Sequence, residues 1–182
     1  MACRRTHTQS KERHMPNPPA IGSLAPDFCL PSPAGTQVCL SNLRGQWVVV
    51  YFYPRDASTG CTAEAMEFNE RLREFHGLDC VVLGISRDSL ASHERFIDKC
   101  KLMVPLLSDE GLSAIEAYGA WRAKKIYGKE IMGVERSTYL VDPQGVVRAA
   151  WPSVRRASGH AAEVLEKLRE VVVGLAEVGK CK

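Results

Sequence analysis

Three residues in the first half of the chain, Pro54, Ser58 and Cys61, have types and spacing suited to cysteine chemistry. Cys61 stands where an apolar strand pattern gives way to a helical pattern, so we expect its side chain in the first turn of a helix. A helix N-terminus has unpaired backbone N–H groups and the positive end of the helix dipole, and both stabilise an anion. The position therefore predicts a reactive thiolate.

The ionisation state of a cysteine decides its reactivity, because the thiolate is the nucleophile. An ordinary thiol has a pKa of about 8.5, so only about 3% is ionised at neutral pH, and a helix N-terminus with a nearby cation lowers that pKa by two or more units. Two units correspond to about 2.7 kcal/mol of preferential thiolate stabilisation. Ser58 offers a hydroxyl that could hydrogen-bond both the sulfur and an oxygen of a substrate, and Gly60 lets the backbone come close.

The cation has to come from another part of the chain, and we expect it to be Arg136, which precedes a strand pattern at 137–141. A guanidinium could hold both the thiolate and an oxygen on which negative charge develops. Each residue also has an ordinary interpretation. Arg136 would be a surface ion-pair partner, Ser58 a plain helix N-cap, and Cys61 a buried structural thiol.

Strand and helix patterns alternate along the chain. Strand patterns cover 37–40, 47–53, 80–85, 105–107, 137–141 and 146–151, and helical patterns cover 62–76, the segment opened by Ser89, 111–118 and 161–175. The run 47–53 is apolar on both faces, as expected of a central strand covered by helices on both sides, and Pro54 ends it. Gly77 is the predicted C-cap of the helix before it. This order predicts an α/β, thioredoxin-like fold with a central mixed β-sheet flanked by helices.

Length and charge favour one globular domain with no nucleic-acid partner. The 182 residues carry a net charge of +3. Residues 1–14 contain four basic residues and one acidic residue and so account for this whole charge, which leaves residues 15–182 with no net charge. A phosphate-binding surface should be basic. No apolar run approaches the roughly 18 residues of a membrane span. We expect a basic, disordered extension at 1–18, a domain at 19–178 and a tail at 179–182. Residues 1–14 are a tail, a weak targeting segment, or an upstream start with Met15 as the initiator.

Cysteine usage favours a reducing compartment, the cytoplasm. The seven cysteines, an odd number, include no C-x-x-C pair and stand at positions 3, 29, 39, 61, 80, 100 and 181. That spacing argues against a zinc cluster and against a thioredoxin-type dithiol, so we expect mostly free thiols, Cys29 and Cys39 among them. The five histidines have no metal spacing either. We expect neither a metal nor a cofactor.

These residues resemble peroxiredoxins, whose signature of proline, three residues, Thr or Ser, two residues and cysteine is present as Pro54, Ser58 and Cys61. The most similar subgroup is the bacterioferritin comigratory protein (BCP) or PrxQ group. The segments that carry the likeness are GSLAPDF (22–28), VVYFYP (49–54), GCT (60–62), LGIS (83–86), PLLSD (105–109) and GVER (133–136). The similarity runs from about residue 20 to residue 175.

The resemblance implies reduction of hydrogen peroxide and organic hydroperoxides through a sulfenic acid on Cys61. Regeneration by thioredoxin or another thiol donor, a role in antioxidant defence, and a monomer or homodimer are further implications. Matched position by position, Cys61 is the peroxidatic residue, Ser58 the hydroxyl, Pro54 the shield of the pocket, Arg136 the cation, and Glu64 a group that orients the arginine.

The chain departs from many relatives at Met66, where they carry a resolving cysteine five residues after the peroxidatic one. Cys100 is the main alternative, because some PrxQ members have a second cysteine about one turn earlier on this helix. It would otherwise be a core residue, since 96, 97 and 100 share an apolar face. Cys80 is a weaker alternative. A cycle in which an external thiol attacks the sulfenic acid also stays open.

Two other classes of function are compatible with the pattern. One is a thioredoxin-fold redox sensor or holdase that is oxidised at Cys61 without efficient turnover. The other is a non-catalytic interaction domain, in which Cys61→Ser would change nothing toward peroxide.

Overall fold

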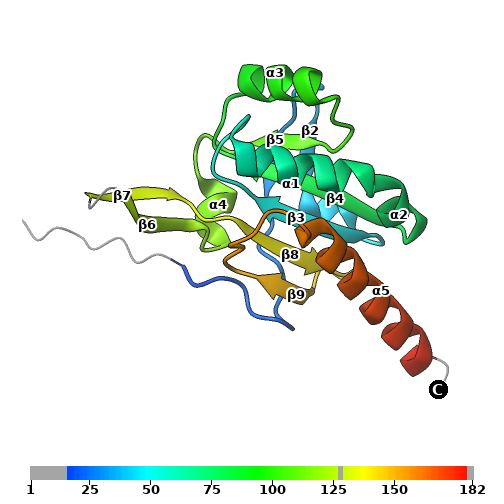
Figure 1. Ribbon diagram of the computed structural model, residues 1–182. Helices are drawn as coiled ribbons and strands as arrows, with labels where there is room; N and C mark the ends of the chain where they lie inside the picture. The colour runs from blue at the N-terminus through cyan, green and yellow to red at the C-terminus, as the bar shows by residue number, and fades with distance from the viewer. Residues whose placement is uncertain (1–15, 127–128, 180–182) are drawn as a thin grey trace, which may run out of the picture.

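The computed structural model of the chain describes residues 16–126 and 129–179, arranged around a five-stranded sheet (Figure 1). The strands lie in the order β5 (Leu106–Ser108), β4 (Cys80–Ser86), β3 (Trp47–Phe52), β8 (Ser137–Val141) and β9 (Val147–Trp151). β3, β4 and β5 are parallel, whereas β8 and β9 are antiparallel to their neighbours. The predicted mixed sheet is confirmed.

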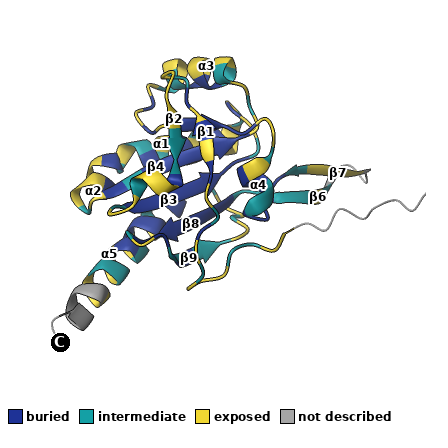
Figure 2. Ribbon diagram, turned by 180° about the vertical axis from the view of Figure 1, so that it is seen from behind, coloured by how far each residue is buried: buried dark blue, intermediate teal, exposed yellow. Residues whose placement is uncertain are grey.

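The central strand β3 is buried at all six positions, as its two-faced apolar pattern predicted. Side chains alternate along a strand, so Val49 and Tyr51 face one layer while Val48, Val50 and Phe52 face the other. The first layer contains α1 (Thr59–Glu70), α2 (Leu72–Gly77) and α5 (His160–Gly179), and the second contains β1 (Cys29–Pro31), the 3₁₀ helix η1 (Leu40–Leu43) and α4 (Ser113–Ala117). Figure 2 shows the buried strands between these two layers.

The remaining helix, α3 (Leu90–Cys100), lies at the top of Figure 1 and buries His93 and Phe96. Its N-cap is Ser89, the residue predicted to open it. Phe96 packs into the same layer as α1, so α3 stands beside the helix that begins near Cys61.

The segment predicted as one helix at 62–76 forms two, α1 and α2, which are separated at Arg71. The apolar stripe of Phe68, Leu72 and Phe75 stays buried across the break, so the periodicity could not reveal it. The C-cap prediction for Gly77 is wrong, because Gly77 is the last residue of α2 and Leu78 is the cap.

A hairpin of β6 (Trp121–Ile126) and β7 (Lys129–Val134) was not predicted. Five of its residues carry charge, and Val134 is its one fully buried position among the residues whose side chains are described. A two-stranded ribbon that projects from the sheet therefore lacks the apolar alternation that marks a strand.

Cys29 and Cys39 form a disulfide, so the expectation that they are free thiols is wrong. The two residues are direct partners in the antiparallel pairing of β1 with β2 (Gln37–Cys39), and this register brings their side chains together. Sequence spacing alone could not reveal the register. Cys61, Cys80 and Cys100 are free.

The predicted basic extension, up to residue 15 and including Cys3, lies outside the described residues, as do 180–182 with Cys181 and the side chain of Leu175. Among the helices that are described, none is long and apolar enough to cross a membrane.

Candidate active site

The sheet topology brings two distant parts of the chain together at the carboxyl end of β3. Phe52, the last residue of β3, pairs with Ser137, the first residue of the antiparallel strand β8. Arg136 therefore lies just beyond the end of β3, where the chain continues through Pro54 into α1. Cys61 is the third residue of α1, so the cation and the cysteine meet across 75 positions of sequence.

The Arg136 guanidinium contacts Cys61 and Glu64 at once. Its Nη2 donates a hydrogen bond to Cys61 Sγ at 3.2 Å, and its Nη1 donates to Glu64 Oε2. Cys61 is 2% exposed and Glu64 is fully buried. Glu64 lies one turn after Cys61 on α1, so the two side chains share a face of the helix. The structure thus brings three of the predicted site residues together, because the Arg136 guanidinium contacts both Cys61 and Glu64.

Burial and charge shift the pKa values of Glu64 and Arg136 in opposite directions. Burial raises the pKa of Glu64 to about 7, although Arg136 lowers it in part. Burial also lowers the pKa of Arg136, but the Glu64 carboxylate and Cys61 raise it by more, so the net pKa lies above its ordinary value. Arg136 therefore remains a cation, while Glu64 is close to titrating at neutral pH.

Ser58 is the N-cap of α1, but its hydroxyl does not bond to the helix or to Cys61. Its Oγ donates to the carbonyl oxygen of Arg55 at 3.2 Å. Gly60 lies against the arginine, since a Cβ added there would stand 3.3 Å from Arg136 Nη2. Pro54 is partly buried at the start of this loop. The structure places these residues around Cys61 without a direct bond from Ser58 to the sulfur.

Tyr51 lies beside the site, although the sequence pattern indicated only that it belongs to the buried strand 47–53. Its hydroxyl and Glu64 Oε1 are both buried, and neither has a hydrogen-bond partner among the described residues. Burial raises the pKa of Tyr51, and the charges of Glu64 and Cys61 raise it further. Side chains alternate between the two faces of β3 and Tyr51 points toward the α1 layer, so this alternation could have indicated its place beside the site.

A second missed group links the loop after β3 to α3. The fully buried His93 on α3 places Nδ1 2.9 Å from Asp56 Oδ2, and the Tyr53 hydroxyl donates to Asp56 Oδ1 at 2.8 Å. Burial raises the pKa of Asp56, but the His93 contact and the Tyr53 hydrogen bond lower it by more. The sequence spacing of the histidines did not indicate this contact, because one histidine and one aspartate do not make a metal site.

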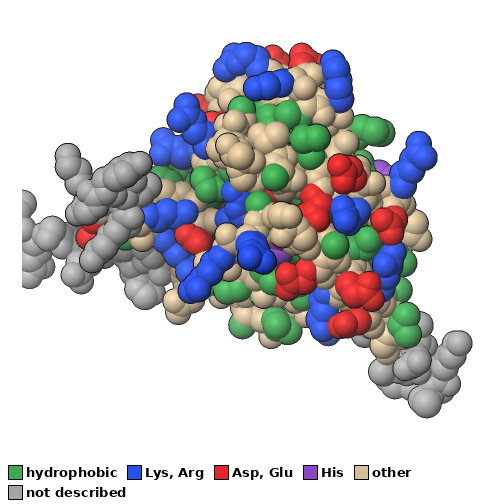
Figure 3. All heavy atoms as spheres, in the orientation of Figure 1, with side chains coloured by type: hydrophobic (Ala, Val, Ile, Leu, Met, Phe, Trp, Pro, Cys, Tyr) green, Lys and Arg blue, Asp and Glu red, His purple; other side chains and the backbone are tan. Residues whose placement is uncertain are grey.

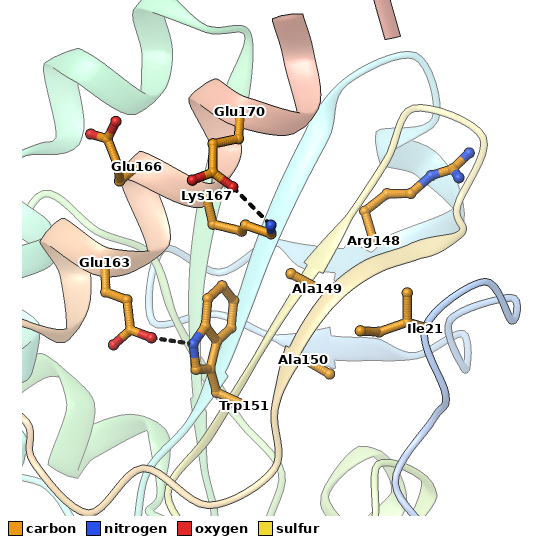
Figure 4. A pocket seen from close by; sticks show the side chains of 9 residues that line it. All are labelled: Ile21, Arg148, Ala149, Ala150, Trp151, Glu163, Glu166, Lys167 and Glu170. Carbon is orange, nitrogen blue, oxygen red and sulfur yellow. Dashed lines mark hydrogen bonds and ion pairs between the residues drawn. The ribbon is translucent and has the colours of Figure 1, made fainter. Parts of the chain in front are cut away.

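A cavity of about 520 Å³ between β9 and α5 contains none of these residues (Figure 4). Its floor is formed by Ala149, Ala150 and Trp151, and Trp151 Nε1 donates to Glu163 Oε1 at 2.7 Å. Within the described part of the chain, no group of three or more His, Cys, Asp or Glu side chains is arranged to hold a metal ion.

Comparison with known proteins agrees with this geometry. The model of the AhpC/TSA family matches residues 21–150. The chain belongs to this family. It is 41% identical to the peroxiredoxin Bcp of Bacillus subtilis, over 83% of this chain and 96% of that protein. It is 37% identical to Bcp of Escherichia coli, over 85% of this chain and 98% of that one. The predicted resemblance to the BCP/PrxQ group is confirmed.

Solved structures give the same result for this peroxiredoxin. The bacterioferritin comigratory protein of Xanthomonas campestris, studied for its alkyl peroxide reduction activity, matches at a TM-score of 0.76 and 41% identity over 80% of this chain and 92% of that one. A PrxQ mutant of Xylella fastidiosa matches at a TM-score of 0.79 and 36% identity, over 84% and 96%. The thioredoxin-like fold and the thiol peroxidase function are thereby confirmed, and the sensor alternative is not favoured.

The structure places Cys80, one of the two predicted resolving cysteines of this peroxiredoxin, away from the first turn of α1. Cys80 pairs with Trp47, at the opposite end of β3 from Cys61. Five residues of parallel strand separate these ends by about 16 Å. Burial also raises the pKa of the Cys80 thiol to about 12, which keeps it protonated.

Cys100 ends α3, partly buried against the α1 layer. Three residues later, the backbone N–H of Met103 bonds to Asn69 in the last turn of α1. A Cys61–Cys100 bond stays a prediction. Met66, at the usual resolving position, is 43% exposed.

Proposed function

We propose that Cys61 is the peroxidatic cysteine of this peroxidase. Its thiolate attacks one oxygen of the peroxide, the O–O bond breaks, and the other oxygen leaves as hydroxide or alkoxide and takes up a proton. Cys61 becomes a sulfenic acid, and water or an alcohol is released. The observation that carries this proposal is the 3.2 Å contact from Arg136 Nη2 to Cys61 Sγ, because a cationic donor at that distance favours the thiolate.

The neighbouring residues would support that step in different ways. Arg136 would also stabilise the oxygen on which charge develops, and buried Glu64 would hold the guanidinium in place. Ser58 would turn its hydroxyl from the Arg55 carbonyl toward the bound peroxide. Pro54 would shield the pocket, while Gly60 leaves room for the arginine.

For substrate and reductant, we propose hydrogen peroxide and organic hydroperoxides, with regeneration by thioredoxin or another thiol. A thiol attacks the Cys61 sulfenic acid, water leaves, and a second thiol reduces the mixed disulfide. Met66 at the usual resolving position supports an external thiol over an internal one, with Cys100 as the alternative. The cytoplasm and a monomer or homodimer remain predictions.

The experiment is to mix reduced protein with one equivalent of peroxide and follow peroxide loss and protein mass. We expect rapid consumption and a gain of one oxygen on Cys61, both absent in Cys61→Ser. A Cys100→Ser variant run in parallel distinguishes the two routes, because an internal disulfide would form only when Cys100 is present. Peroxide consumption that survives in Cys61→Ser would contradict the proposal.

A further inference from the structure

A separate cavity of about 240 Å³ lies beside the loop that leads into α1. Its walls come from that loop, from the turn after β4 and from α3, and its lining residues are Arg55, Asp56, Ala57, Asp88, Ser92, Arg95, Phe96 and Lys99. Phe96 also packs in the layer that contains Cys61. Ala57 in the cavity lining precedes the reacting Cys61 by four residues, so the cavity is near Cys61 along the chain but is lined by other residues.

Three cations converge on this cavity. Arg95 and Lys99 stand four residues apart on α3 and so share one face of the helix, while Arg55 faces them from the loop. All three are exposed, and in the ranges 16–126 and 129–179 no carboxylate forms an ion pair with any of them. Figure 3 shows Lys and Arg side chains over α3, at the top of the view, with acidic side chains between them.

The two carboxylates that line the cavity, Asp56 and Asp88, accept hydrogen bonds from other groups of the protein. Asp56 contacts His93 and accepts a hydrogen bond from Tyr53. Asp88 Oδ2 accepts hydrogen bonds from the backbone N–H of Asp56 at 2.9 Å and from Ser86 Oγ at 2.8 Å. Among the residues that the structure describes, neither carboxylate forms an ion pair with the three cations, which leaves the cations available to a ligand. The side chain of Ser92 is hydrogen-bonded to Asp56.

We propose that this cavity binds the carboxylate of a small anionic thiol that reduces the Cys61 sulfenic acid. The inference rests on the proposed function and names the reductant class for that site. A volume of about 240 Å³ accommodates the anionic arm of a small molecule. Ala57 precedes Cys61 by four residues, which span at most about 14 Å, so a thiol on a peptide-sized arm bridges the two places. Cations at the cavity raise the local concentration of an anionic ligand.

The reaction balances with two thiols. The thiolate of the first attacks the Cys61 sulfur, the S–O bond breaks, and hydroxide takes up the thiol proton and leaves as water. The thiolate of the second attacks the outer sulfur of the mixed disulfide and releases the Cys61 thiolate. One sulfenic acid is reduced, and two thiols are oxidised to one disulfide.

The test compares an N-acetylated tetrapeptide of one cysteine followed by three glycines with its C-terminal amide, which share the thiol and the length and differ only in the terminal carboxylate. Protein is oxidised with one equivalent of peroxide, its sulfenic acid is verified by mass, and the rate of reduction by each thiol is then measured. We expect wild type to prefer the peptide with the free carboxylate over the neutral amide, and the preference to fall about fivefold in the double variant Arg95→Gln, Lys99→Gln, since each exposed ion pair contributes modestly. It should also fall at high salt.

The matched control, Arg73→Gln combined with Arg156→Gln, also removes two positive charges, from exposed positions outside the cavity. An unchanged preference in the double variant, an equal fall in the control, or a wild-type preference for the neutral thiol overturns the proposal. A change confined to carboxylate-bearing hydroperoxides, measured in a parallel arm, overturns it too and assigns the cavity to the peroxide. A Cys61–Cys100 disulfide at the mass step overturns this proposal and leaves the proposed function intact, whereas failure of peroxide to oxidise Cys61 at all indicates failure of the proposed function itself.

Discussion

Arg136 is shared between two acceptors, the Cys61 sulfur and the Glu64 carboxylate. The fork geometry of a guanidinium makes this sharing available, because two parallel N–H groups can face two acceptors at once. Glu64 is buried on one side of the fork and fixes its orientation, and Cys61 lies on the other. Charge type alone would not produce this arrangement.

The first prediction concerns Arg136→Lys, which keeps the charge but removes the fork. An ammonium can approach the sulfur or the carboxylate but does not reproduce both contacts in one plane. We expect the rate constant for peroxide reduction to fall about 100-fold, the scale of losing a charge-stabilising donor, in rapid-mixing kinetics. A melting temperature close to wild type would exclude unfolding as the cause. A rate within twofold of wild type would mean that charge alone suffices.

The second prediction concerns the pH dependence of stability through Glu64. Its pKa is raised from an ordinary 4.5 to about 7 by burial, so the folded protein binds this proton more tightly than the unfolded chain does. The stabilising contribution is then fully present below about pH 4.5 and is lost as the pH rises through about 7. Denaturant unfolding at several pH values should show this loss in wild type.

The control for that measurement is Glu64→Gln, which cannot titrate. The lowered pKa of Asp56 has the opposite sign, with stability lost as the pH falls, and it is common to both proteins. The difference between the two stability curves therefore isolates Glu64. Parallel curves from pH 5 to pH 8 would contradict the raised pKa.

At the scale of elements, the contact between Asp56 and His93 fastens the loop before α1 to the first half of α3. Both side chains are buried, and Tyr53 contributes a hydrogen bond to the same carboxylate. The loop that contains Ser58 is therefore held at one end by β3 and at its middle by α3. This tether joins the loop before α1 to α3 through buried polar contacts.

The third prediction is that His93→Leu weakens the fold. Removal of His93 leaves the Asp56 carboxylate buried without its imidazole partner, which costs about 3 kcal/mol or more in comparable buried pairs. Urea unfolding measures the loss, and the exposed His76 of α2 supplies a matched control as His76→Leu. An equal, small effect of both substitutions would indicate that the tether contributes little.

The fourth prediction concerns the contact between β4 and β3 beneath the site. A Cβ at Gly84 would stand 2.6 Å from the hydroxyl and the ring of Tyr51 and 2.8 Å from Leu106. Gly84→Ala should therefore displace Tyr51 and cost about 1–3 kcal/mol, measured by chemical unfolding. The control Gly174→Ala, on α5 with no atom within 4 Å of the added Cβ, should be neutral or slightly stabilising. A stable Gly84→Ala protein would show that the ring moves without cost.

On the scale of the whole molecule, the second layer is covered at its edge by the β1–β2 hairpin, which the Cys29–Cys39 disulfide closes. The hairpin packs Leu30 against the face of the sheet opposite α1. Its chemistry is therefore separate from that of Cys61, although both involve cysteines.

The fifth prediction follows from that separation. The double variant Cys29→Ser, Cys39→Ser removes a link across 10 residues of sequence, and a loop of that length stabilises a fold by up to about 3 kcal/mol in the chain-entropy view. We expect a lower unfolding midpoint and an unchanged rate of peroxide reduction. A large fall in the peroxide rate would couple the hairpin to the active site. Equal midpoints for wild type with and without reductant would show that the link adds no stability.

Much of the site was predictable because local sequence constrains it. Pro54 ends a strand, Ser58 and Cys61 begin a helix, and each of these is decided within a few residues of chain. The hairpin of β6 and β7 was not predictable, because those of its side chains that the structure describes bury little surface. The helix break at Arg71 was not predictable either, because the stripe of buried apolar side chains continues from α1 into α2.

The sequence by itself determined that a cysteine stands at a helix start after a central strand, since strand and helix periodicities and their boundaries are local properties. Only the tertiary structure decided what surrounds that cysteine. Arg136 reaches Cys61 because β8 pairs antiparallel with β3, and His93 reaches Asp56 because α3 packs beside α1. Such contacts depend on register and packing between segments far apart in the chain, and no local pattern encodes them.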